Sequence, residues 1–125
     1  MEQYFGVDIG GTAVKWALVA EDYGVLKNGE FATPYEGAEE LADAVAAVYR
    51  EQGAGGVLKF LDQAPFGKML RERCSVPCFV ENDGKSCALG EYTTGALKGC
   101  SSGVVLVLGT GVGGGIVIDG KVYKG

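Results

Sequence analysis

The sequence of 125 residues contains no histidine, only three prolines, and 11 basic residues against 16 acidic ones. Without histidine, a zinc site with mixed cysteine and histidine ligands cannot form. The excess of acidic residues gives a net charge of −5, and no basic stripe is present to replace the counterions of a nucleic acid. We therefore expect no nucleic-acid partner.

Long apolar segments are also missing. No apolar run reaches the length of a membrane span, and the N-terminus lacks the basic and apolar regions of a secretory signal. We therefore expect a cytoplasmic protein with no membrane partner. The four cysteines, at positions 74, 78, 87 and 100, lack paired Cys-x-x-Cys spacing, so we interpret them as reduced, small apolar residues.

Glycine is abundant, with 22 residues gathered at turns, and two glycine-rich turns stand out. The first, Gly10-Gly11-Thr12, follows the apolar segment 4–9 and precedes the segment 14–20. The second, 109–115, lies between the segments 104–108 and 116–118. The pattern indicates two β-hairpins with glycine at their tips.

A turn without Cβ atoms lets backbone N–H groups approach a ligand closely, and successive N–H groups form an anion-binding concavity. We predict that the two turns face each other across a cleft and hold a polyphosphate between them. The alternative is that the glycines only satisfy positive φ angles in tight turns. That alternative accounts for Gly10-Gly11 but poorly for the longer run 109–115.

The remaining pattern predicts a mixed α/β chain. Segment 57–61 is a weak candidate for a further strand between the first two helices. The expected elements are strands at 4–9, 13–20, 25–32, 78–80, 104–108 and 116–122, the last with a turn at Asp119-Gly120, and helices at 37–52, 65–73 and 85–92.

Three blocks, in this order, resemble the ROK family of bacterial sugar kinases and sugar-responsive repressors. The blocks are Gly6 to Lys15, Phe79 to Glu91 and Leu106 to Val117. The resemblance implies the ribonuclease H-like α/β fold of the actin and hexokinase type, a mixed sheet flanked by helices. It also implies a cytoplasmic enzyme of carbohydrate metabolism that transfers phosphate from ATP to a sugar hydroxyl, with Mg²⁺ as metal and a homodimer for the full-length protein.

The first and third blocks carry the expected nucleotide site. The resemblance implies that Asp8 holds Mg²⁺, since a carboxylate beside phosphates is repulsive without the metal. Lys15 would neutralise phosphate charge; the alternative is an ordinary outward-facing strand lysine. The residues expected to donate hydrogen bonds to phosphate are Gly10, Gly11, Thr12, Gly109, Thr110, Gly111, Gly113 and Gly114.

The second block carries the expected chemistry. Asp83 is the predicted general base, since a carboxylate in hydrogen-bond reach takes the proton of the sugar hydroxyl. Asn82 resembles the ligand of a sugar hydroxyl in this family. The alternative makes both residues a plain helix N-cap. Glu81 and Glu91 are expected to be structural or surface acids.

The resemblance covers only the N-terminal part of such a protein. We expect a first domain at 1–100, the start of a second at 101–125, and a deletion near 53–56. The resemblance implies that this deletion removes a strand that ends in a sugar-contacting turn, and that its loss would leave a slot in the central sheet. No helix-turn-helix precedes Met1, which favours a kinase over a repressor. The alternatives are a sugar-binding regulator without turnover and a fragment without activity of its own.

Overall fold

The computed structural model describes residues 2–52, 56–60, 66–109 and 111–125, with 56–60 described as backbone only. The chain divides into two compact units, residues 1–80 and 81–125, and each is described by itself. The predicted boundary near residue 100 concerns the domains of a longer protein and stays a prediction. No helix among the described residues is long and apolar enough to cross a membrane.

Unit 1 is built on a five-stranded sheet. Three antiparallel strands follow one another as predicted: β1 (Gln3–Ile9), β2 (Ala13–Ala20) and β3 (Val25–Ala32). Two parallel strands, β4 (Gly56–Phe60) and β5 (Cys78–Val80), complete the order β3-β2-β1-β4-β5. The sheet is therefore mixed, as expected for this α/β fold.

The slot expected in the middle of this sheet is absent, and that expectation was wrong. β4 lies between β1 and β5 and pairs with both in parallel, with Gln3 opposite Gly56 and Leu58 opposite Cys78. Four residues of β1 and all three residues of β5 have a partner in β4. The weak strand candidate at 57–61 thus corresponds to the strand that fills the slot. The predicted junction falls largely on residues 53–55, which lie outside the described residues.

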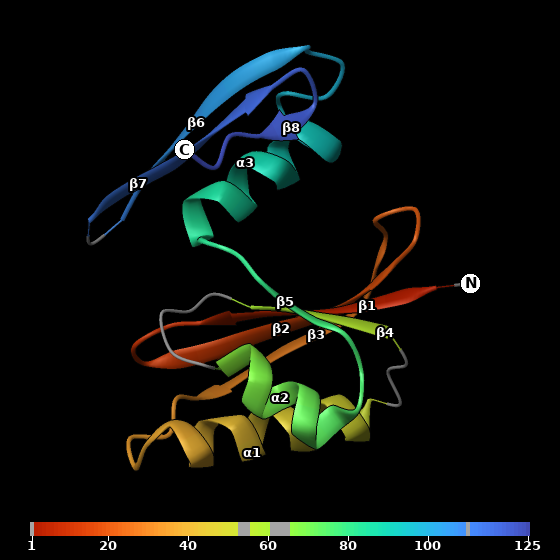
Figure 1. Ribbon diagram of the computed structural model, residues 1–125, viewed down its shortest axis with the longest axis vertical. Coiled ribbons are helices and arrows are strands. Elements are labelled where there is room, and N and C mark those ends of the chain that lie inside the picture. Colours follow the sequence, from red (N-terminus) through yellow and green to blue (C-terminus); the bar gives the residue numbers. More distant parts are fainter. Residues whose placement is uncertain (1, 53–55, 61–65, 110) are drawn as a thin grey trace. The chain divides into compact units, whose positions relative to one another are not determined.

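Two helices cover one face of this sheet, α1 (Ala38–Glu51) and α2 (Phe66–Cys74) (Figure 1). The inward face of α1 follows the helical spacing that the sequence predicts, because Val45 and Tyr49 are buried there. Arg73 of α2 pairs with two acids of α1, Asp43 at 2.8 Å and Glu39, and so joins the helices. The core of unit 1 consists of Phe5, Val7, Val14, Leu18, Ala42, Val45, Ala46, Tyr49, Phe66, Leu70 and Cys78.

Unit 2 packs one helix on a three-stranded antiparallel sheet. Its elements are α3 (Asp83–Thr93), β6 (Ser102–Leu108), β7 (Val112–Ile118) and β8 (Lys121–Val122). β7 begins at Val112, four residues earlier than predicted, so three of the glycines belong to the strand and not to the turn. The predicted turn at Asp119-Gly120 is confirmed, with φ of 47° and 77° at its two residues.

The glycines of β7 explain that early start. A Cβ on Gly115 would lie 2.7 Å from the Cβ of Ala88 in α3. A Cβ on Gly84, at the start of α3, would lie 2.5 Å from the backbone nitrogen of Gly114. Helix and strand thus approach each other backbone to backbone. This packing, which the sequence analysis did not consider, accounts for part of the glycine run.

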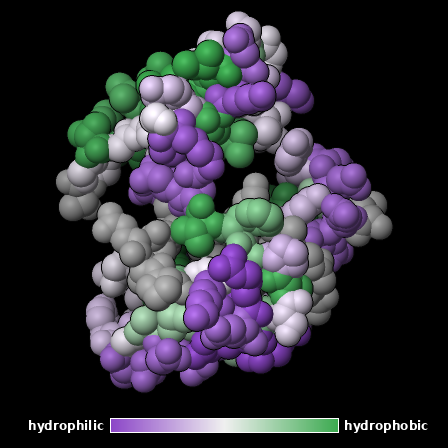
Figure 2. All heavy atoms as spheres, viewed as in Figure 1, coloured by the Kyte–Doolittle hydropathy of each residue, from purple (hydrophilic) through white to green (hydrophobic). Residues whose placement is uncertain are grey.

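The other face of β6 and β7 is apolar and exposed. Residues paired across the two strands share a face, so Val104 lies beside Ile116 and Leu108 beside Val112. In Figure 2 apolar atoms gather over these two strands. The exposed side chains on this face, between 41% and 78% accessible, belong to Val104, Leu106, Leu108, Val112, Ile116 and Ile118.

Candidate functional site

The turn between β1 and β2 presents unpaired backbone donors. The Gly10 N–H donates to the Ala13 carbonyl at 2.9 Å and closes the turn. A Cβ on Gly10 would lie 2.8 Å from that same carbonyl oxygen, so the turn requires glycine here. The N–H groups of Gly11 and Thr12 and the Thr12 hydroxyl have no acceptor among the residues that the structure describes. Both residues are exposed, so these three donors are open to an anion.

Two charged side chains stand at the base of this turn. Asp8 and Lys15 are directly paired across β1 and β2, and both are exposed. Their neighbours Val7 and Val14 point into the core beneath the helices, so Asp8 and Lys15 share the opposite face. The structure therefore brings together all predicted site residues of unit 1 at one end of the β1–β2 pair.

Thr33 is a further polar residue at this turn that the sequence analysis did not identify as part of the site. Its hydroxyl donates to the Gly10 carbonyl at 2.7 Å, and its N–H donates to the Thr12 carbonyl at 3.0 Å. From the sequence, Thr33-Pro34 is predicted to end the strand 25–32 and to open the helix that follows. The only sequence feature that pointed to Thr33 was its position directly after the predicted strand 25–32, which does not reveal the strand register.

The glycine turn between β6 and β7 is open on its outer side. The Gly109 N–H donates to the Gly111 carbonyl at 2.9 Å and closes the turn, and Thr110 lies outside the described residues. A Cβ on Gly109, Gly111 or Gly113 would meet no atom within 4 Å. These glycines have free space before them, in contrast to Gly114 and Gly115, which pack closely. The run thus divides into an open part and a packing part.

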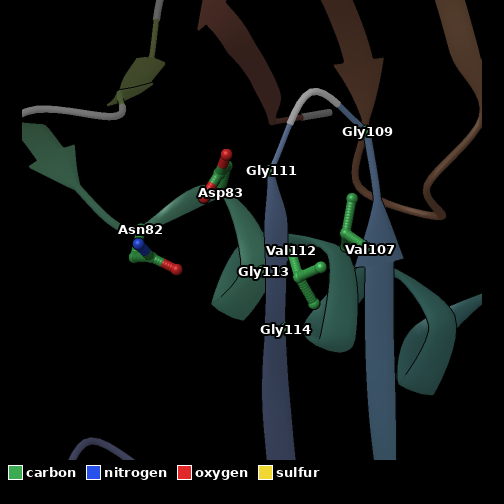
Figure 3. A pocket seen from close by; sticks show the side chains of 8 residues that line it. All are labelled: Asn82, Asp83, Val107, Gly109, Gly111, Val112, Gly113 and Gly114. Atoms are coloured by element: carbon green, nitrogen blue, oxygen red, sulfur yellow. The ribbon is translucent and has the colours of Figure 1, made fainter.

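A cavity of about 580 Å³ adjoins this open part (Figure 3). The polar side chains in its wall are Asn82 and Asp83, which lie at the start of α3 and point in different directions. The cavity is lined by Asn82, Asp83, Val107, Gly109, Gly111, Val112, Gly113 and Gly114. Unit 2 alone therefore brings the predicted base, the predicted sugar ligand and the second glycine turn to one cavity.

Asn82 is the N-cap of α3, as the alternative interpretation proposed. Its Oδ1 accepts from the Lys85 N–H at 3.2 Å, and one Asp83 carboxylate oxygen accepts from the Gly84 N–H at 2.8 Å. Each side chain keeps one polar group without a partner among the described residues: the Asn82 amide NH₂ and the second Asp83 oxygen. Capping and ligand binding are therefore compatible at both positions.

The carboxylates of Glu81 and Glu91 each bind a partner within unit 2. Burial by itself raises the pKa of Glu81. The Lys124 ammonium at 2.9 Å and the Asn82 N–H at 3.0 Å stabilise the carboxylate more than burial disfavours it, so the pKa of Glu81 lies below its usual range. Glu91 accepts from the Ala96 N–H at 2.7 Å beyond the end of α3. Both acids have a structural partner, in agreement with the sequence analysis.

The metal assignment depends on Asp8. Among the described residues no group of three or more acids or cysteines could hold a metal ion. Mg²⁺ in nucleotide sites binds through one or two carboxylates together with water and phosphate oxygens. An exposed single carboxylate beside free N–H donors fits that mode of binding. The predicted clamp between the two glycine turns involves both units and stays a prediction.

Comparison with known proteins gives a consistent picture. The model of the ROK family matches residues 57–125. The glucokinase of Streptomyces coelicolor is 31% identical over 143 residues, which cover 96% of this chain and 45% of the enzyme. The N-acetylmannosamine kinase of Yersinia pestis is 33% identical over 148 residues, which cover 100% of this chain and 50% of the enzyme.

Solved structures of ROK family proteins are also similar to this chain. A ROK family glucokinase from Streptomyces griseus, solved with glucose and AMPPNP, is 31% identical and superposes with a TM-score of 0.84, covering 98% of this chain and 46% of that one. The chain thus spans about half the length of the curated relatives it matches. Both curated alignments are longer than the 125 residues of this chain, so these relatives contain internal segments that it lacks.

Proposed function

Because this chain belongs to the ROK family, we propose that it forms the N-terminal part of an ATP-dependent sugar kinase. One observation carries the proposal: the Asp83 carboxylate shares a cavity with an open glycine turn. Phosphoryl transfer requires aligned reactants, neutralised phosphate charge and a group that accepts the proton of the attacking hydroxyl. The turn offers backbone that a phosphate can approach without meeting side chains, and Asp83 offers the proton acceptor.

Each of the two turns would bind nucleotide phosphate. In unit 1 the free donors are the N–H groups of Gly11 and Thr12 and the Thr12 hydroxyl. In unit 2 the open backbone at Gly109, Gly111 and Gly113 lets phosphate approach without meeting side chains. Asp8 would hold Mg²⁺, which would supply positive charge against the phosphates. Lys15, on the same face, supplies a second positive charge.

The proposed sugar is glucose or an N-acetylhexosamine, the substrate classes named for the relatives. Asn82 would bind a sugar hydroxyl through its free amide NH₂ while its oxygen continues to cap α3. Asp83 would accept the proton of the attacking hydroxyl through its unpaired oxygen.

We place the segment that the relatives contain and this chain lacks near residues 53–56. The family match begins at residue 57, directly after this point. β4 then occupies the sheet position at which the longer relatives would have their own strand. The shorter strand would lack the sugar-contacting turn expected at the end of the family's longer strand, so we expect the 125-residue chain alone not to phosphorylate sugars.

Two chimeras test this proposal. The first joins residues 1–125 to the C-terminal half of the Streptomyces coelicolor glucokinase. The second, the restored chimera, also replaces residues 53–56 by the corresponding longer segment of that enzyme. Each is incubated with Mg-ATP and glucose, N-acetylglucosamine or N-acetylmannosamine, and phosphorylated sugar is detected by mass. We expect product from the restored chimera and none from the first.

The two chimeras also separate the alternatives. Product from both would show that nothing essential is missing near residues 53–56. No product from either, together with sugar binding in calorimetry, would favour a sugar-responsive regulator of the same family.

A further inference from the structure

The backbone geometry of the first glycine turn is held by a residue 21 positions beyond it. Thr33 follows β3, and β3 pairs with β2 so that Ala32 lies opposite Ala13. This register places Thr33 level with Thr12. The Thr33 N–H donates to the Thr12 carbonyl at 3.0 Å, which extends the pairing of the strands by one step into the turn.

The Thr33 side chain reaches further into the turn. Its hydroxyl donates to the carbonyl of Gly10 at 2.7 Å, while the Gly10 N–H donates to the Ala13 carbonyl at 2.9 Å. Both polar groups of the Gly10 backbone are therefore occupied by the protein. The Thr12 carbonyl is occupied as well.

These contacts divide the polar groups of the turn into carbonyls that are hydrogen-bonded by Thr33 and N–H groups that are not bonded within the described residues. Two of its acceptors, the carbonyls of Gly10 and Thr12, are bound to Thr33. Two of its donors, the N–H groups of Gly11 and Thr12, have no partner among the described residues. A carbonyl oxygen that turned toward a phosphate would repel it. A residue that binds the carbonyls therefore favours the orientation that leaves the donors outward.

We propose that Thr33 is the positioning residue of the phosphate-binding turn 10–12, acting through the Gly10 carbonyl. The proposal rests on the proposed function insofar as the ligand is a nucleotide phosphate. Thr33 does not itself contact the ligand. Its hydroxyl fixes the peptide plane between Gly10 and Gly11, and so directs the Gly11 N–H toward the anion.

The test uses three variants of the 125-residue chain. Thr33→Val removes the hydroxyl with little change of shape, and Thr33→Ser retains it. Thr94→Val is the matched control, since the exposed Thr94 hydroxyl donates to the Gly90 carbonyl at 3.1 Å, outside the turn. Two quantities are measured: amide hydrogen exchange of Gly10 by NMR, without ligand, and the dissociation constant of Mg-ATP in the restored chimera carrying the same substitutions.

For Thr33→Val we expect exchange at Gly10 to rise about fivefold, as expected for loss of one neutral hydrogen bond, and Mg-ATP to bind about fivefold more weakly. Thr33→Ser should restore both quantities to within about twofold, and Thr94→Val should change neither. Gly10 exchange in Thr33→Val equal to that of the unsubstituted chain would overturn the positioning role. If the restored chimera does not bind Mg-ATP at all, the proposed function fails, and the exchange measurement still decides the role of Thr33.

Discussion

Asp8 lies directly opposite Lys15 across the β1–β2 pair, on the face of the sheet away from α1 and α2. Both side chains are exposed, and the turn with its free N–H groups begins two residues beyond Asp8. The carboxylate that we propose as the Mg²⁺ ligand and the ammonium that we propose as a phosphate contact thus stand at the same end of the same two strands. The pairing gives Lys15 a defined position in relation to the proposed metal ligand.

Lys15 is therefore expected to contribute to nucleotide affinity. Lys15→Ala in the restored chimera should weaken Mg-ATP binding about tenfold, the effect of losing one charge-assisted contact. Lys27→Ala is the control, because Lys27 is an exposed lysine of β3 in the same sheet. Calorimetric titration measures the Mg-ATP affinity of both variants. Equal affinities for the two variants would make Lys15 an ordinary strand lysine.

Asp83→Asn separates catalysis from binding. In the restored chimera kcat should fall by roughly two to four orders of magnitude, since the amide cannot accept the hydroxyl proton. The Mg-ATP dissociation constant should stay within about twofold. Asp119→Asn is a suitable control, because Asp119 is an exposed turn residue with φ of 47°, which asparagine tolerates. Near-normal turnover in Asp83→Asn would remove Asp83 from the mechanism.

Replacing two glycines of β7 by alanine should have different effects on the stability of unit 2. Gly115→Ala forces a methyl group to within 2.7 Å of the Ala88 Cβ and should destabilise unit 2 by about 1–3 kcal/mol. Gly113→Ala meets no atom within 4 Å and should change stability by less than about 0.5 kcal/mol, while it narrows the cavity beside Asp83. Urea titrations followed by the amide signals of β6 and β7 measure the free energy of unfolding of unit 2 in both variants. Equal losses of stability in the two variants would contradict the distinction between open and closely packed glycines in the run 109–115.

The stability of unit 1 should fall at high pH because of Cys78. Burial raises the pKa of this thiol from 9.0 to about 11. The unfolded chain loses the thiol proton near pH 9, whereas the folded chain keeps it to about pH 11, so the unfolded state binds fewer protons in that window and stability falls as pH rises.

Urea denaturation monitored by Trp16 fluorescence between pH 8 and 11 tests this pH dependence, and Cys78→Ala should flatten it. Cys100, which is exposed, provides the control substitution Cys100→Ala, with the slope unchanged. A Cys78→Ala variant with the full slope would assign the pH effect to other groups.

The sequence predicted the bounds of β2 and β3 because turn residues flank both strands: Gly11-Thr12 before β2, Tyr23-Gly24 before β3 and Thr33-Pro34 after it. It placed the start of β7 too late, because glycine has low strand propensity and the close approach of α3 outweighs it. It also predicted a slot where β4 lies, since five residues without clear periodicity do not reveal their pairing partners. Thr33 was missed for a related reason: its contact with Gly10 depends on strand register, which no local pattern contains.

The apolar outer face of β6 and β7 has a consequence for how this polypeptide behaves in solution. β6 is an edge strand of its sheet, so six exposed aliphatic side chains adjoin a row of backbone groups available for pairing. Such an edge promotes association with other chains. One of the six side chains, that of Val112, also lines the cavity, whereas those of Val104 and Leu106 do not. Replacing Leu106 or Val104 by lysine would therefore raise the concentration at which the chain stays monomeric without changing a residue of the cavity wall.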